Sequence, residues 1–143
     1  MTQASSAPEI FRFTDPCVVL PGQFIHILLI ALSPESMWVW IGLDEHLGEA
    51  LALSASAGPQ AGPLGPLSTT ILPGDDDELS MKLSRAIVLM TGRRQCFANC
   101  SIPAGLASAA GIWPRVLEVL RARLLEAGLH KSCSRAEPAA SQQ

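Results

Sequence analysis

The sequence has little charge, no basic excess and no paired-cysteine motif. Charged residues make up 16% of its 143 residues, against about 25% in an average soluble domain. Ten Lys and Arg stand against thirteen Asp and Glu, which gives a net charge of −3. A nucleic-acid-binding domain normally carries a basic face or stripe, so this composition argues against that class of protein.

Signals for export and for membrane insertion are also missing. Residues 1–9 carry no Lys or Arg, so we expect no secretory signal peptide. The longest apolar run, Phe24–Leu32, contains His26 and is far shorter than the ~20 residues that a membrane-spanning helix needs. We therefore expect neither export nor a membrane anchor.

The four cysteines, Cys17, Cys96, Cys100 and Cys133, form no CxxC pair and match no zinc-ligand spacing. On a strand, Cys96 and Cys100 would lie about 13 Å apart, which is too far for a disulfide. We expect these thiols to act as small buried hydrophobic groups in a reducing, intracellular compartment.

Turn residues divide the middle of the chain into short apolar segments. These segments predict strands over 10–14, 23–32, 37–41, 49–54, 67–72 and 95–101. Apolar residues at helical spacing predict two main helices, one between the acidic run at 75–78 and Gly92, the other between Ile112 and Gly128. The pattern indicates an α+β fold: a single domain with a mostly antiparallel sheet of five to six strands and both helices on one face.

The ends of the chain differ in composition from this middle part. Residues 1–9 and 129–143 are rich in small and polar residues, and we expect two disordered tails around a domain at 10–128. Within that domain, the Gly- and Pro-rich stretch 55–66 predicts a flexible surface loop rather than a domain boundary.

The run Phe24–Leu32 is apolar on both of its alternating faces. Two helices can cover only one face of a sheet, and a sheet face exposed to water normally carries polar residues. We therefore predict that the other face packs on a partner chain. The partner-interface candidates are Phe24, Leu28, Trp38 and Trp40. A cover from within the chain, such as the Gly/Pro loop, is the other interpretation.

Residues that could carry chemistry are scattered. His26, His46 and His130 fall in a predicted strand, a turn and a tail, with no cysteine or carboxylate at ligand spacing. The acids at 75–77 resemble a cation site, but acids at a helix start more often act as a solvated cap. We therefore predict no catalytic residue, no cofactor and no bound metal, and a function other than an enzyme.

Two charged clusters flank the first predicted helix. Asp75, Asp76 and Asp77 stand at its start, and Arg93 and Arg94 lie just past its end. Because the clusters have opposite signs, they could contact two complementary patches on a client protein. The helix macrodipole favours the same arrangement without any partner, so both interpretations stay open.

Two long stretches resemble the proteasome assembly chaperone 4 family. The segment FIHILLIALSPESMWVWIGLDEHLGEALAL is similar to the strand-turn-strand core of that family. The segment STTILPGDDDELSMKLSRAIVLMTGRRQCFANCS is similar to a later part, with matches at Ser68, Thr69, Leu72, Gly74, Asp75, Leu83, Thr91, Gln95, Phe97 and Asn99. The order and spacing of the motifs carry the resemblance. The chain departs from the family in its 55–66 loop and at Pro73, which replaces a leucine.

The resemblance implies a chaperone that pairs with a sister of the same fold, proteasome assembly chaperone 3. Such a heterodimer assists assembly of the alpha ring of the 20S proteasome, chiefly through the fifth alpha-type subunit, and leaves before the particle matures. It also implies a cytoplasmic location, with the nucleus open as a second one, and no nucleic-acid or membrane partner. A non-catalytic adaptor for another cytosolic complex, and a small enzyme with an unrecognised site, are the alternative functions.

Overall fold

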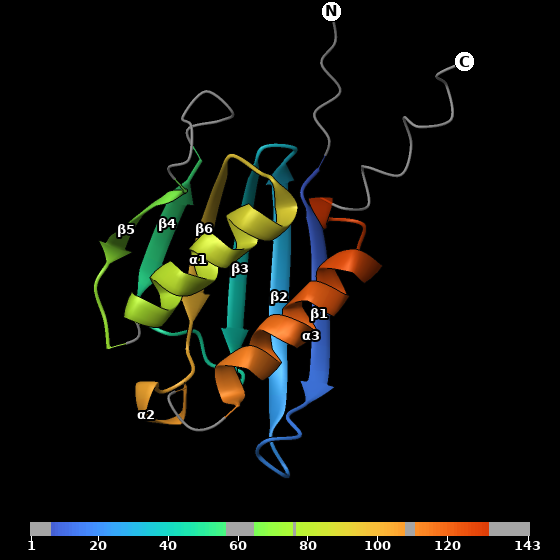
Figure 1. Cartoon of the computed structure of the whole chain (residues 1–143), viewed down its shortest axis with the longest axis vertical. Helices are drawn as coiled ribbons and strands as arrows, with labels where there is room; N and C mark the ends of the chain where they lie inside the picture. Colours follow the sequence, from blue (N-terminus) through green and yellow to red (C-terminus); the bar gives the residue numbers. More distant parts are fainter. Residues whose placement is uncertain (1–6, 57–64, 76, 108–110, 132–143) are drawn as a thin grey trace, which may run out of the picture.

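Six strands form one open sheet in a computed structural model that describes residues 7–56, 65–75, 77–107 and 111–131 (Figure 1). The order across the sheet is β1-β2-β3-β6-β4-β5. The strands are β1 (Glu9–Pro16), β2 (Phe24–Ser33), β3 (Ser36–Gly42), β4 (Leu51–Ala55), β5 (Leu67–Leu72) and β6 (Gln95–Cys100). All neighbouring strands pair antiparallel except β3 and β6, which run parallel. The predicted fold class is confirmed: an α+β single domain with a mostly antiparallel sheet.

Both main helices lie on the same side of the sheet (Figure 1). The helices are α1 (Asp77–Thr91), the short α2 (Ala104–Ala107) and α3 (Ile112–Glu126). Helix α1 packs on β4, β5 and β6, and α3 lies over β1 and β2. The two helices thus divide one face of the sheet between them.

The core lies between that face and the helices. Every second residue of the central strands points into it, as the two-residue period of a strand requires. The buried sheet residues include Ile25, Ile27, Leu29, Met37, Val39, Ile41, Cys96, Ala98 and Cys100, and the helices add Leu83, Ile87, Ile112, Val116, Leu120 and Leu124. The remaining, alternating residues of each strand point away from the helices. The second apolar face of β2 is therefore not buried by the helices that bury the first.

Polar side chains and glycine set the ends of several elements. Between β2 and β3, Ser33 Oγ accepts the backbone N–H groups of Glu35 at 3.2 Å and Ser36 at 3.1 Å, which fixes the tight turn. Helix α1 ends where Gly92 adopts φ 71°, a left-handed conformation that glycine takes without a steric cost. Its N–H donates to the carbonyl of Val88 at 2.9 Å.

An arginine fastens α3 to the edge strand β1. Arg123 donates from Nε and Nη2 to the carboxylate of Asp15, at 2.8 and 2.7 Å. Its Nη1 donates to Glu126 at 2.6 Å, and its guanidinium lies 4.8 Å from the ring centre of Phe13. The hydrogen bonds that Arg123 donates, those to Asp15 before that to Glu126, raise the pKa of Arg123.

The folded part extends slightly beyond the segment predicted from composition. Strand β1 begins at Glu9, inside the expected N-terminal tail, because its backbone pairs with Ala31. At the other end, Leu129 packs against the core although it falls in the expected C-terminal tail. Strand β4 ends at Ala55, the first residue of the expected loop. Most of that loop, residues 57–64, lies outside the described residues.

Three of the cysteines are buried free thiols, as predicted: Cys17, Cys96 and Cys100. Cys133 lies outside the described residues. Burial raises the pKa of the Cys96 thiol. Across the described ranges, no helix combines the length and the apolar character needed to cross a bilayer.

Candidate partner interface on the open sheet face

A row of apolar side chains crosses the sheet on the side away from the helices. Strand register places Ile10, Ile30, Trp38, Phe97 and Leu53 directly beside one another, on β1, β2, β3, β6 and β4 in turn. Neighbouring strands lie about 4.8 Å apart, so the row spans about 19 Å. It continues to Thr69 on β5, and Leu67 and Ile71 on the same side of β5 are 73% and 42% exposed. We call this side the open face.

No described helix covers the open face (Figure 1). Ile10 is 60% exposed and Phe24 48%, while Ile30, Trp38 and Phe97 are half-buried. Ile25, Ile27 and Leu29 of β2, which point toward the helices, are fully buried. A contiguous apolar surface of this kind marks an interaction site more often than an inert surface.

The structure separates the predicted interface residues into two groups. Phe24, Leu28 and Trp38 lie on the open face, where Phe24 is exposed and the other two are half-buried. Trp40 shares that face but is only 7% exposed. Most of the surface of Trp40 is covered within this chain, and Trp38 is the outward-facing indole.

Three neighbours explain the burial of Trp40. Its Nε1 donates to Ser101 Oγ at 3.2 Å, and its ring stacks on His26 with centroids 6.5 Å apart. The ring also lies close over Gly42, where an added Cβ would come within 2.7 Å of Cζ2. Trp40 thus belongs to the internal packing of this end of the sheet.

A polar hollow of about 430 Å³ adjoins Trp40 at the rim of the open face. Arg12, Thr14, His26 and Glu45 contribute its polar groups. Thr14 Oγ1 and His26 Nδ1 lie 3.4 Å apart. Arg12 makes no side-chain hydrogen bond or ion pair within the described ranges. An apolar centre with a polar rim is the usual anatomy of a protein–protein interface.

Sequence reasoning missed several members of this surface. Ile10, Leu53 and Phe97 complete the row, whereas the sequence pattern predicts only that they lie on strands. The signal was present, because all three occupy alternating positions in their strands. The missing knowledge was the strand order, which places β6 beside β3 and β4.

The acidic candidates for client contact lie at the start of α1. Asp75 is exposed in the preceding turn, and Asp77 is the first residue of the helix. Asp76 lies outside the described residues. The arginine candidates lie at the other end of this 15-residue helix, about 22 Å away. The structure therefore does not bring the two clusters together.

The two arginines contact the turn between β2 and β3. Arg93 donates from Nη1 to the carbonyl oxygen of Ser33, and burial lowers the pKa of Arg93. Arg94 Nε lies 3.7 Å from the Glu35 carboxylate, and both side chains are largely exposed. Neither arginine lies in the last turn of α1, so the helix dipole is not the main reason for their position.

Groups that could bind a metal ion are not gathered in the described ranges. No cluster of three or more His, Cys, Asp or Glu side chains occurs there in a geometry that could hold one. His46 lies 3.6 Å from Asp44 in an exposed turn, and His26 contacts Trp40 and Thr14.

Fold and surface together define an α+β domain with one helix-covered and one apolar, open sheet face. No protein-family model matches the sequence, and no curated protein matches it. In three dimensions the chain is similar to a crystal structure described as a novel chaperone complex for yeast 20S proteasome assembly. The TM-score is 0.58 with 10% sequence identity, over 82% of this chain and 98% of that one. At this level of identity the likeness establishes the fold alone.

Proposed function

We propose that this protein is an assembly chaperone of the 20S proteasome that pairs through its open face with a sister chain of the same fold. The observation that carries the proposal is the apolar row centred on Trp38 and Phe97, which no described helix covers. The fold likeness to a yeast proteasome assembly chaperone complex supports it. So does the order of sequence motifs between Phe24 and Ser101.

Pairing through the open face accounts for the low charge of the chain. A sister chain of the same fold would bring a comparable sheet, and two sheets pack face to face at about 10 Å. Trp38 and Phe97 would supply the aromatic anchors that dominate the energetics of most interfaces. Arg12, at the rim, would form an ion pair with a carboxylate of the partner chain.

The finer assignments follow from the family resemblance. The heterodimer would assist formation of the alpha ring, chiefly by binding the fifth alpha-type subunit, and would leave before the particle matures. The role is one of binding, with no catalytic step and no cofactor. The proposed location is the cytoplasm, with the nucleus as a second compartment.

Affinity purification of the tagged full-length chain from cells tests this function. We expect the sister chaperone and alpha-type subunits in stoichiometric amounts, and no mature 20S particles. Recovery of a different complex without proteasome subunits would overturn the proposal and favour the adaptor alternative. A Trp38→Asp variant should lose the sister chaperone in the same experiment, whereas a Leu89→Asp variant, at an exposed leucine of α1 on the other side of the sheet, should retain it.

A further inference from the structure

A second candidate surface lies on the opposite side of the sheet, between α1 and α3. A hollow of about 460 Å³ separates the two helices, with Leu89 and Met90 on one wall and Leu117 and Arg121 on the other. A second hollow of about 420 Å³ continues along α3 and shares Leu117 and Arg121 with the first. We call the two together the α1–α3 groove.

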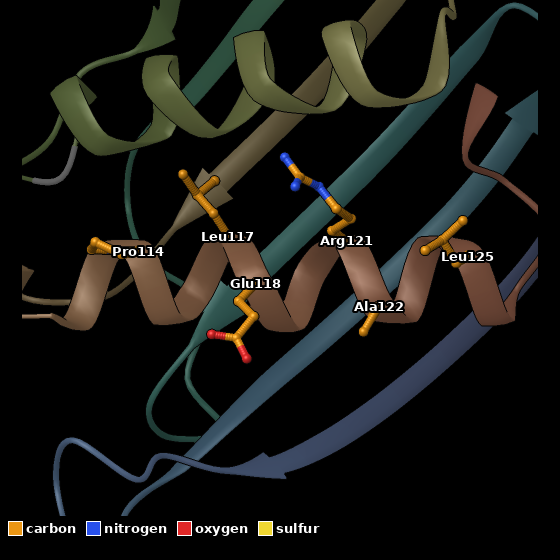
Figure 2. Close-up of a pocket in the computed structure, with 6 residues that line it drawn as sticks. All are labelled: Pro114, Leu117, Glu118, Arg121, Ala122 and Leu125. Atoms are coloured by element: carbon orange, nitrogen blue, oxygen red, sulfur yellow. The ribbon is translucent and has the colours of Figure 1, made fainter. Parts of the chain in front are cut away.

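The walls of the α1–α3 groove are aliphatic. Leu89 on α1 is 50% exposed and Leu125 on α3 is 44% exposed. Figure 2 shows Leu117 on the side of α3 that faces α1. Amphipathic helices normally turn leucines toward the core and charged residues toward solvent. Exposed leucines on both helices therefore indicate a surface that binds another molecule.

Arg121 differs from the other described arginines of α3. Arg115 pairs with Glu118 at 3.1 Å, and Arg123 pairs with Asp15 at 2.7 Å. Arg121 makes no side-chain hydrogen bond or ion pair with any described residue. Figure 2 shows it pointing toward α1, while Glu118 points to the other side of α3. The guanidinium of Arg121 therefore pairs with no described carboxylate, although Glu118 lines the hollow along α3 with it.

The charges that line the hollow between the helices have one sign. Arg121, His130 and Lys131 contribute its ionisable groups, and none of the described residues that line it is acidic. This is unusual for a chain with a net charge of −3. The hollow along α3 also includes Glu118, which points to the far side of that helix (Figure 2). The part of the groove between the helices thus favours a negatively charged occupant, whereas the open face is selective mainly through its apolar row.

We propose that the α1–α3 groove binds an acidic, aliphatic segment of a protein partner. Its aliphatic side chains would lie between Leu89, Leu117 and Leu125, and a carboxylate would accept two parallel N–H donors from Arg121. Because the groove and the open face lie on opposite sides of the sheet, both can be occupied at once. Assignment of this segment to the proteasome client depends on the proposed function. The preference for an acidic, aliphatic segment does not.

A peptide titration tests the chemistry of the groove. The probe is a synthetic amphipathic helix of about four turns, with a leucine stripe flanked by glutamates, and its match carries glutamine in place of every glutamate. Added to the full-length chain with ¹³C-labelled methyl groups, the acidic probe should shift the methyl signals of Leu89, Leu117 and Leu125. The glutamine probe should bind at least about tenfold more weakly, because a charge-assisted hydrogen bond is lost.

Two charge reversals provide the matched comparison. Arg121→Glu should weaken binding of the acidic probe by at least about tenfold, and Arg121→Gln should weaken it less. Arg94→Glu, the same change at an exposed arginine outside the groove, should leave it unchanged. Equal binding of both probes, no effect of Arg121→Glu, or shifts confined to open-face residues such as Ile30 would each overturn the proposal. Because the side chain of Arg121 has no described polar contact, its variants should keep the melting temperature of the wild type.

The same variants test the binding preference of the groove independently of the proposed function. If the client is an alpha-type subunit, Arg121→Glu should weaken its binding to the heterodimer and leave the heterodimer intact. If Arg121→Glu weakens probe binding but not binding of the alpha-type subunit, the chemistry of the groove stands and its assignment to the client is wrong.

Discussion

Trp38 lies directly beside Phe97 on the open face, across the parallel pair of strands β3 and β6. These two strands are the central pair of the sheet, so the two aromatic rings stand at the middle of the open face. Their strand neighbours Val39 and Ala98 point the other way and are fully buried under the helices. The sheet thus presents its largest apolar side chains on the side that the described helices leave open.

Disruption of the Arg123–Asp15 pair should loosen α3 from the sheet. The two side chains are 25% and 18% exposed and share two hydrogen bonds, which makes the pair stronger than a typical surface ion pair. We expect Asp15→Asn to lower the free energy of unfolding by about 1–2 kcal/mol. A double-mutant cycle with Arg123→Met, measured by urea unfolding, checks this value. Strict additivity of the two changes would show that the pair contributes nothing.

Asn99 should be essential for the chain segment that enters β4. It is 3% exposed, accepts the N–H of Gly48 at 2.9 Å and donates to the carbonyl oxygen of Ala50. Asn99→Leu leaves both backbone groups without this partner and should cost about 2–3 kcal/mol of stability. Amide hydrogen exchange at Gly48 should accelerate more than the global change in stability predicts. Unchanged protection at Gly48 would contradict this role.

The stability of the fold should fall in alkaline solution because of Cys96. Burial raises the pKa of this thiol in the folded state. Above the unfolded pKa of about 8.5, the unfolded chain loses a proton that the folded chain keeps, so stability decreases as the pH rises. The decrease should approach about 1.4 kcal/mol per pH unit from this group.

Tyrosine and lysine add little background to that measurement, because the sequence has no tyrosine and only two lysines, Lys82 and Lys131. The other three cysteines are present in both proteins, so their contribution cancels in the comparison. Urea unfolding of the wild type and of Cys96→Ala between about pH 7.5 and 10 gives the comparison, because this range spans the unfolded pKa of about 8.5. The alanine variant should show a smaller slope. Identical slopes in the two proteins would mean that Cys96 does not carry the effect.

Arg93 and Arg94 should support the turn between β2 and β3 rather than a client contact. We expect Arg93→Glu to lower stability by about 1 kcal/mol, because it loses its hydrogen bond to Ser33. Arg94→Glu should change stability by less than about 0.5 kcal/mol, since its pairing with Glu35 is exposed. Association kinetics with an alpha-type subunit should stay at the wild-type rate for both. A slower association that also depends less on salt would restore the client-contact interpretation.

Local signals in the sequence predicted most of the elements. β-Branched residues between Pro66 and Pro73 define β5, and it spans Leu67–Leu72 as expected. Ser33 and Pro34 mark the turn before β3 because their side chains favour a tight bend. Gly92 marks the end of α1.

Long-range contacts account for the differences from prediction. Strand β1 extends to Pro16 because its backbone pairs with β2, and Asp15 is satisfied by Arg123, more than a hundred positions later. No local pattern reveals such a partner. Strand β4 begins at Leu51, two residues later than expected, where the contacts of Asn99 to the preceding segment end.

The candidate interface was predictable only in part, because it also depends on long-range contacts. The two-residue period of a strand places Trp38 and Trp40 on one face, and the structure confirms this. Their different exposure depends on Ser101 and Gly42, which meet Trp40 only in the folded chain. Likewise, the α1–α3 groove follows from the placement of two helices on one sheet, which spacing along either helix does not determine.

The dissociation constant of the purified complex with the sister chaperone tests the open-face interface most directly. Trp38→Asp should raise it by about thirtyfold or more, because a buried aromatic anchor contributes at least about 2 kcal/mol. Leu89→Asp, at an exposed leucine on the helix side, should leave it unchanged, and Trp38→Ala guards against loss of folding in the charged variant. An unchanged dissociation constant for both Trp38 variants, or a complex disrupted by Leu89→Asp instead, would contradict pairing through the open face.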